Sequence, residues 1–208
     1  MYVIRYAFAL LMLAVTFRAA GQSLLPVDKN LEVKDDQLSE QQLRDFQVLT
    51  KQKVNEFQRY LSIIADPEQT DQVRELAIEN AKLLFLPDAS MQVGKAKSSV
   101  VKEYPLAIYL RRLKNLENKY FNVTITFYDL ALIGDWQKTK AGYATTATYF
   151  QHFQGRGKNG KMQYEDKTVK TIAVDLRNRK DPFYEEHRWT VLLGNIRVTE
   201  INPKNATL

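Results

Sequence analysis

The sequence predicts an α+β fold, with helices in the first part of the chain and an antiparallel sheet in the second. Between residues 39 and 116 apolar residues recur at three- and four-residue spacing, which is the period of an amphipathic helix. After residue 119 the period changes to two, and β-branched and aromatic residues dominate, which is typical of strands. Helices followed by strands, rather than alternating with them, favour an α+β architecture.

Composition sets the broad class. The chain has 208 residues, of which 45% are hydrophobic and 26% charged, so it is globular rather than disordered or collagen-like. It has no Cys, which excludes disulfides, thiolate nucleophiles and zinc–thiolate sites. With only two His, a multi-His metal centre is disfavoured. We therefore expect no metal and no cofactor, and one domain over residues 39–201.

The first residues have the pattern of a secretory signal. Arg5 is followed by an apolar run over residues 7–17 and by the small residues 19–21. The run holds 11 residues, fewer than the roughly 20 that a spanning helix needs. We expect cleavage after residue 21, so that Gln22 begins the mature chain and residues 22–38 form a leader segment. The alternative is an uncleaved amphipathic anchor. The expected location is the periplasm or cell envelope, or outside the cell.

The net charge of the chain favours no particular partner. Loss of residues 1–21 removes two Arg and no acid, so the net charge falls from +6 to +4. This mild bias favours solubility, and export would separate the protein from nucleic acid. The basic, glycine-rich residues 155–161 are typical of a hairpin tip, with a phosphate site as the alternative.

Two helices are predicted first. Ser39 and Gln42 form a capping box, and Asp66-Pro67 ends the helix about 25 residues later. Its apolar stripe comprises Leu43, Phe46, Leu49, Phe57, Tyr60, Leu61 and Ile64. A second helix begins at Thr70 or Asp71 and is ended by Pro87. Its expected buried face comprises Val73, Leu76, Ala77, Ala81, Leu84 and Phe85.

The remaining elements follow in order. Met91 and Val93 indicate a short strand, residues 94–103 a loop, and Pro105 the start of a third helix of about 12 residues. Four long strands are predicted around residues 121–128, 143–153, 170–176 and 189–198. In the third of them Lys170, Ile172, Val174 and Leu176 share one face. Gly194 predicts a bulge in the last strand, and residues 202–208 are left as a tail.

This order of elements carries a family resemblance. The order is two helices, the string Leu84-Phe85-Leu86-Pro87-Asp88-Ala89, a short strand, a third helix and four long strands ending in Trp189-Thr-Val-Leu-Leu. Over roughly residues 40–200 this order resembles the nuclear transport factor 2-like superfamily. The resemblance implies a cone-shaped, cystatin-like roll, with three helices packed on a strongly curved antiparallel sheet. The superfamily includes isomerases, dehydratases, cyclases and binding modules, so the fold does not decide the function.

Two residues are candidates for a general base. Asp88 follows Pro87, and burial would raise the pKa of its carboxyl; the alternative is a turn residue that bonds backbone N–H groups. His152 lies on a strand among aromatic residues and could act near neutral pH. The alternative is a half-exposed strand residue, because the neighbours of the same parity, Thr146, Thr148 and Phe150, include no acid to orient the ring.

Other polar residues have simpler interpretations. Asp129 and Asp135-Trp136 bracket an expected turn, where paired carboxylates could do acid–base work or serve the turn alone. His187 lies in a charged turn before the last strand and is expected to be solvated. No phosphate loop, nucleophile elbow or metal-ligand cluster is found in the sequence.

Aromatic residues are the candidate ligand contacts. Tyr143 and Tyr149 share a strand face, and Trp189 begins the last strand. On a concave sheet these side chains could line a pocket with hydroxyl groups for a ligand. Packing beneath the helices would explain the same residues without a ligand.

The leading functional hypothesis is an exported, non-catalytic binding module that holds an envelope protein or a small apolar ligand. The alternative is a small isomerase or hydrolyase with Asp88 or His152 as general base. A third hypothesis is a subunit that forms a homodimer through the open face of its sheet.

Overall fold

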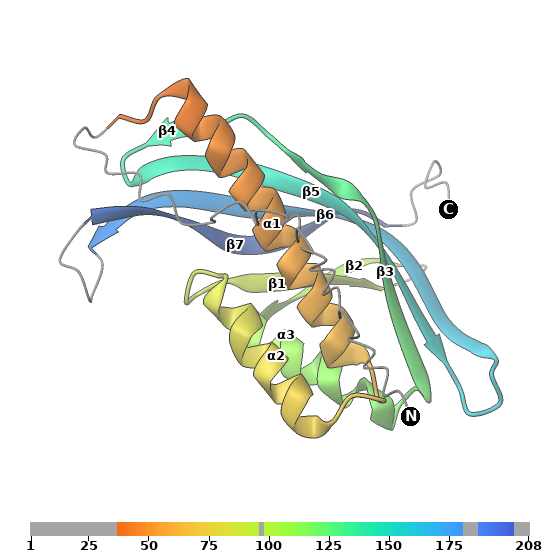
Figure 1. The fold of residues 1–208 in the computed structure, drawn as a ribbon. Coiled ribbons are helices and arrows are strands. Elements are labelled where there is room, and N and C mark those ends of the chain that lie inside the picture. Colours follow the sequence, from red (N-terminus) through yellow and green to blue (C-terminus); the bar gives the residue numbers. More distant parts are fainter. Residues whose placement is uncertain (1–36, 96–97, 181–186, 202–208) are drawn as a thin grey trace, which may run out of the picture. The chain divides into compact units, whose positions relative to one another are not determined.

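The computed structural model describes residues 37–95, 98–180 and 187–201. In these residues three helices pack on a seven-stranded sheet, which confirms the α+β prediction (Figure 1). The expected signal segment, the leader up to residue 36 and the tail 202–208 lie outside the described residues. No helix in the described part is long and apolar enough to cross a bilayer.

The first helix, α1 (Glu40–Ala65), forms as its local sequence predicts. The Ser39 hydroxyl accepts a hydrogen bond from the Gln42 backbone N–H at 3.3 Å, and the Gln42 side chain accepts one from Ser39 N–H at 2.8 Å. Asp66 caps the other end of the helix. The buried stripe is made of Phe46, Thr50, Val54, Phe57, Leu61, Ile64 and Ala65. This stripe lies against the sheet and brings α1 across it.

The second helix, α2 (Asp71–Leu83), begins after Thr70 as predicted, but its buried face differs from the prediction. Ala77 and Ala81 are buried, whereas the side chains of Val73 and Leu76 are 42% and 61% exposed. Arg74 and Ile78 take the inward positions instead. The hydrophobic pattern of the sequence could not predict this orientation of the helix, because the cationic side chain of Arg74 lies at the centre of the buried face.

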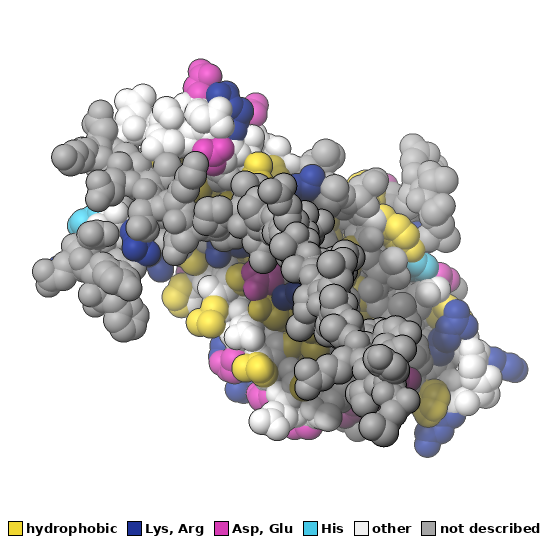
Figure 2. Space-filling view, in the orientation of Figure 1, with side chains coloured by type: hydrophobic (Ala, Val, Ile, Leu, Met, Phe, Trp, Pro, Cys, Tyr) yellow, Lys and Arg dark blue, Asp and Glu magenta, His cyan; other side chains and the backbone are white. Residues whose placement is uncertain are grey.

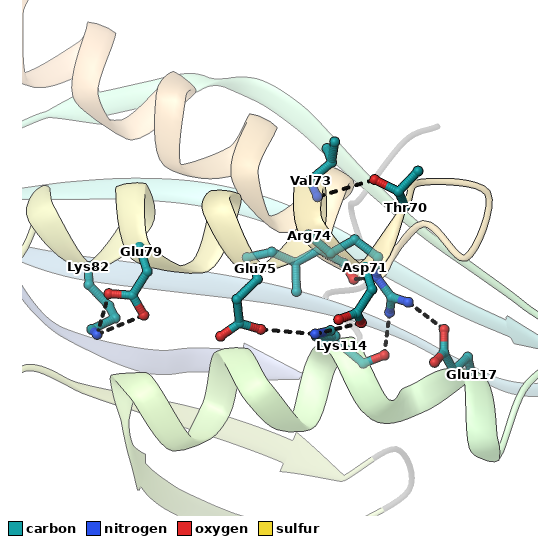
Figure 3. A network of polar contacts seen from close by, with 10 residues as sticks. Thr70, Asp71, Val73, Arg74, Glu75, Glu79, Lys82, Lys114 and Glu117 are labelled. Carbon is teal, nitrogen blue, oxygen red and sulfur yellow. Dashed lines mark hydrogen bonds and ion pairs between the residues drawn. The ribbon is translucent and has the colours of Figure 1, made fainter.

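Arg74 is buried because each part of its guanidinium group has an acceptor (Figure 3). Nε donates to the Ile64 carbonyl at the end of α1 at 2.9 Å. The two terminal nitrogens donate to the Lys114 carbonyl and to the Glu117 carboxylate. One side chain of α2 therefore connects the end of α1 with the end of α3. Beside it the Lys114 ammonium pairs with Asp71 at 2.7 Å and Glu75 at 2.9 Å.

A strand occupies most of the region that was predicted to be a loop. β1 (Ser90–Lys95) confirms the short strand at Met91, and β2 (Ser98–Pro105) pairs with it in antiparallel register. The loop prediction for residues 94–103 is therefore wrong. The polar sequence of β2 suits an edge strand, which has a partner on one side only and often carries charged residues. The third helix, α3 (Leu106–Lys114), follows Pro105 and continues into the 3-10 turn η1 (Asn115–Asn118).

The four long strands are all present and longer than predicted. They are β3 (Asn122–Ile133), β5 (Gly142–Arg156), β6 (Met162–Lys180) and β7 (His187–Ile201). A further strand that the sequence did not predict, β4 (Gln137–Thr139), pairs with the start of β5. Because β3 reaches Ile133, Asp129 lies within a strand, and the expected turn beside it is wrong.

The strand order in the sheet is β2-β1-β7-β6-β5-β3. All its pairs are antiparallel except β1 with β7, which run parallel with Met91 opposite Ile196. The sheet is therefore mixed rather than wholly antiparallel, because β1 arrives after two helices and not through a hairpin. Gly194 and Asn195 both lie opposite the single residue Ala173. This two-against-one pairing is the bulge that was predicted at Gly194.

Residues 155–161 form the tip of the β5–β6 hairpin, as predicted. Gly157 N–H donates to the Lys161 carbonyl at 3.0 Å, and Gly160 has a positive φ of 72°. Arg156, Lys158 and Lys161 are exposed around this turn. Figure 2 shows basic side chains gathered there, on a surface that faces solvent.

Candidate functional site

Two faces of β5 and β6 carry different chemistry. The inner face, which the helices cover, holds the odd-numbered residues of β5 from Tyr143 to Gln151 and the even-numbered residues of β6 from Asp166 to Leu176. Toward one end of this face the side chains are apolar: Ile172, Val174 and Leu176 are all buried. Toward the other end the same parity brings polar residues under the helices.

We call these residues the inner polar cluster: Tyr109 from α3, Tyr149 and Gln151 from β5, and Asp166, Thr168 and Lys170 from β6. All six are buried. Tyr149 lies directly opposite Lys170, and Gln151 opposite Thr168, in the antiparallel register of β5 and β6. Side chains at such paired positions are neighbours, with Cβ atoms about 5 Å apart.

Four polar atoms of the cluster are buried without a hydrogen-bond partner among the residues that the structure describes. They are the Tyr149 hydroxyl, Gln151 Oε1, Asp166 Oδ1 and Thr168 Oγ1. A buried polar atom without a partner costs about 1–3 kcal/mol, and most such atoms in proteins are paired. Four more such atoms lie outside the cluster, namely Gln58 Nε2, Arg177 Nε, Asn178 Oδ1 and Trp189 Nε1. The inner polar cluster is the candidate site because its four atoms share one face of the sheet.

Burial also shifts the titration of the cluster. Desolvation raises the pKa of the Asp166 carboxyl, against the hydrogen bond at 2.7 Å from the Tyr164 hydroxyl and the positive charge of Lys170. Burial raises the pKa of the Tyr149 hydroxyl well above its usual range. The pKa of Tyr109 also rises, first through burial and then through the negative charge of Asp166.

Lys170 has the least usual setting in the cluster. Its side chain is 3% exposed, and its ammonium lies 3.7 Å from Met91 Sδ and 5.8 Å from the centre of the Tyr109 ring. No carboxylate of the described residues lies within ion-pair distance of it. Burial lowers the pKa of Lys170 to about 8, because the charged form loses its hydration.

The two predicted base candidates both lie away from this cluster. Asp88 is exposed in the turn that follows α2. His152 is 4% exposed, but it is on the face of β5 that points away from the inner polar cluster. Its Nε2 lies 2.7 Å from Glu165 Oε1, and its Nδ1 lies 3.1 Å from the Tyr128 hydroxyl. The expectation that no acid orients this ring is wrong, because Glu165 comes from the neighbouring strand.

The remaining acid and histidine candidates are dispersed. Asp135 is exposed in the connection between β3 and β4, and Asp129 lies within β3, so the structure does not place them at one turn. His187 is exposed at the start of β7. In the described residues no group of three or more His, Cys, Asp or Glu could hold a metal ion.

The three predicted aromatic contacts divide into two places. Tyr143 and Trp189 pack with ring centres 5.6 Å apart, and the Tyr143 hydroxyl accepts a hydrogen bond from Leu38 N–H at 3.0 Å. Tyr149 lies further along β5, 5.9 Å from the Phe127 ring and within the inner polar cluster. Tyr149 belongs to the inner polar cluster, whereas the Trp189 indole Nε1, also buried without a partner in the described residues, lies away from it.

The sequence contains a pattern that points to the polar residues of β6, although they were not among the predicted site residues. Lys170 shares its alternation with Ile172, Val174 and Leu176, and extending that alternation backwards reaches Thr168 and Asp166. That these positions are buried is seen only in the structure, where Tyr109 of α3 lies beside Lys170.

Comparison with known proteins gives similarity of structure alone. No family model and no curated protein matches the sequence. Among solved structures, the chain is similar to a proposed scytalone dehydratase from Novosphingobium aromaticivorans, with 9% identity over 79% of this chain and 99% of that one, at a TM-score of 0.41. It is similar to an NTF2-like protein of unknown function from Exiguobacterium sp. 255-15, with 9% identity over 71% and 98% of the two chains, at a TM-score of 0.35.

A third similar structure is the epoxide hydrolase/cyclase-like enzyme SalBIII of salinomycin pyran ring formation. It is 15% identical over 73% of this chain and 97% of that one, at a TM-score of 0.32. One of the similar structures is thus described as NTF2-like. The activities named for these proteins do not transfer to this chain at such identities.

Proposed function

We propose that this protein binds a small organic molecule against the inner face of its sheet, after export to the periplasm or cell envelope. The observation that carries the proposal is the set of four unpaired, buried polar atoms in the inner polar cluster. The binding function is the one expected from the sequence, but the ligand is a small molecule with polar groups instead of an apolar one. A purely apolar molecule would leave these atoms unpaired, whereas a molecule with hydroxyl or carbonyl groups would satisfy them.

The chemistry of the cluster defines what the ligand must carry. Gln151 Oε1 accepts hydrogen bonds, and Asp166 Oδ1 does so when its carboxyl is ionised. The ligand must therefore supply hydrogen-bond donors to both oxygens. The Tyr149 and Thr168 hydroxyls can donate or accept. Phe127 and Tyr109 add aromatic surface beside them. An aromatic ring with hydroxyl substituents fits this combination of groups.

Calorimetric titration of the mature chain with 4-hydroxybenzyl alcohol tests the proposal. We expect saturable binding that Gln151→Leu weakens by about tenfold, the equivalent of one hydrogen bond of roughly 1.4 kcal/mol. Gln154→Leu is the matched control, because this half-buried residue is on the opposite face of the same strand, with its amide donating to Glu165 at 3.2 Å. Equal effects of the two substitutions, or no saturable heat, would contradict binding at the cluster.

Acid–base catalysis at Asp166 is the second candidate function. It replaces the predicted isomerase or hydrolyase with Asp88 or His152 as base, since neither residue reaches the inner face. The observation in its favour is that burial raises the pKa of Asp166 while one of its oxygens has no partner among the described residues. Proton exchange of cyclohexanone in deuterated water, followed by NMR, should then be faster with the wild type than with Asp166→Asn. Asp88→Asn should leave the rate unchanged.

A further inference from the structure

Lys170 is a buried amine whose contacts do not explain why a lysine occupies its position. Its ammonium lies near a thioether sulfur and an aromatic ring, and it has no ion pair within the described residues. The negative charge of Asp166 acts on it only from beyond ion-pair distance and does not offset the effect of burial. Burying a charged ammonium in such surroundings costs free energy. A Met or Leu would fill the same space without this cost, so the amine needs a function that only an amine can perform.

We propose that Lys170 is a nucleophile that forms an imine with an aldehyde or ketone group of the ligand. This inference rests on the proposed function, because it requires that a ligand reach the inner polar cluster. The neutral amine nitrogen adds to the carbonyl carbon, the C=O bond becomes a C–OH bond, and loss of that oxygen as water leaves a C=N bond. The step consumes one amine and one carbonyl and releases one water, with no oxidant or reductant.

The surroundings of Lys170 suit each part of this reaction. Only a neutral amine adds to a carbonyl, and burial favours the neutral form. With a pKa of about 8 against 10.5 for an ordinary lysine, the neutral fraction of Lys170 at pH 7 is about 300-fold larger. Lysines desolvated in apolar surroundings are the ones that serve as imine-forming residues.

The residues beside Lys170 can hold the carbonyl group. Tyr149, which lies directly across from Lys170, carries a buried hydroxyl with no partner in the described part of the chain. A carbonyl oxygen bound between the two residues would accept a hydrogen bond from this hydroxyl. Such a bond polarises the carbonyl and stabilises the negative charge that develops on its oxygen during addition.

Lys53 provides an internal comparison within the same chain. It is half-buried on α1, outside the inner polar cluster, and burial also lowers its pKa while the charge of Glu56 opposes the shift. If burial alone determined reactivity, Lys53 would react detectably as well. If the inner polar cluster recruits the carbonyl, reaction should concentrate at Lys170.

Reductive trapping tests the inference. The mature chain is incubated at pH 7 with 4-hydroxybenzaldehyde and sodium cyanoborohydride, and the modified lysines are identified by peptide mass spectrometry. We expect the hydroxybenzyl group on Lys170 at a rate at least about tenfold above that of any other lysine, Lys53 included. The rate at Lys170 should level off above about pH 8, whereas exposed lysines should continue to accelerate toward pH 10.5.

Controls separate this inference from the proposed function. Lys170→Met should abolish the fast labelling, and Lys53→Met should leave it unchanged. 4-Hydroxybenzyl alcohol, which has the same ring but no carbonyl, should compete with the aldehyde and slow the labelling. Binding of the alcohol without selective trapping at Lys170 would overturn the imine and leave the binding function in place. Absence of both binding and trapping would overturn both.

Discussion

Single buried residues determine what the inner face of this sheet can do. Thr168 and Ile172 have the same parity on β6 and both are buried, yet one has a hydroxyl without a partner in the described residues and the other completes an apolar core. Natural proteins keep such unfavourable polar groups where function requires them, at some cost in stability. This trade-off can be measured one residue at a time.

Thr168→Val should stabilise the protein and weaken its ligand binding. The substitution keeps the shape of the side chain and removes a buried hydroxyl, so we expect the free energy of unfolding to rise by about 1 kcal/mol. Urea denaturation measures the stability, and titration with 4-hydroxybenzyl alcohol measures the binding. Thr146→Val, on the exposed face of β5, is the matched control and should change neither by more than about 0.5 kcal/mol. A loss of stability in Thr168→Val would show that its hydroxyl is paired.

The charge of Lys170 should appear in the dependence of stability on pH. Its pKa is about 8 in the folded chain and near 10.5 when unfolded, so between these values the unfolded chain binds more protons. The free energy of unfolding should therefore rise with pH across this interval, by up to about 3 kcal/mol from this group. Lys170→Met should be more stable than the wild type at pH 7, and the difference should shrink toward pH 10. A difference that is constant from pH 7 to 10 would show that Lys170 is not desolvated.

At the scale of elements, the helices are joined by buried contacts that differ in kind. Phe57 of α1 is completely buried, with its ring centre 4.7 Å from that of Phe85. Arg74 of α2 instead connects three segments through hydrogen bonds to two backbone carbonyls and one carboxylate. Apolar packing thus joins α1 to the segment that follows α2, and a single guanidinium fixes α2 against α3.

Phe57→Ala should destabilise the protein by about 3–5 kcal/mol, because it removes a buried aromatic ring and leaves a cavity. Chemical denaturation followed by circular dichroism measures this change. Val48→Ala, an exposed position of the same helix, provides the comparison and should alter the midpoint only slightly. An unchanged midpoint for Phe57→Ala would mean that α1 does not cover the sheet.

Arg74→Met should cost about 2–4 kcal/mol, since it leaves the Ile64 and Lys114 carbonyls without their donor. Glu117→Gln removes only a partly exposed charge and should cost less than about 1 kcal/mol. Thermal unfolding of the two variants distinguishes their contributions. Equal losses would assign the stability of this junction to the ion pair rather than to the carbonyl bonds.

Elements were predictable from the sequence where local signals determine them. The capping box at Ser39 and the apolar stripe of α1 lie in the sequence itself, as do the alternations of the long strands. β2 was missed because an edge strand depends on pairing with β1, which no local pattern records. Arg74 and the buried polar residues of β6 were missed for a related reason: their burial depends on segments that pack over them from elsewhere in the chain.

At the scale of the whole molecule, the sequence pattern of residues 1–21 predicts an export segment that is cleaved from the chain. Protein purified from its native host should therefore begin at Gln22, which intact mass spectrometry can determine. A full-length mass in the membrane fraction would contradict export by this route.

Removal of the signal should leave the fold intact, whereas a cut slightly further along should not. A chain that starts at Gln22 keeps the hydrogen bond from Leu38 N–H to the buried Tyr143 hydroxyl and the capping box of α1. A chain that starts at Gln41 loses both, together with the buried Leu38 side chain. Loss of an N-cap costs about 1 kcal/mol, and an unpaired buried hydroxyl a further 1–3 kcal/mol. We expect the unfolding midpoint of the shorter chain to fall clearly below that of the chain from Gln22 under the same denaturant. Equal midpoints would show that Leu38 and Ser39 do not anchor α1 to the sheet.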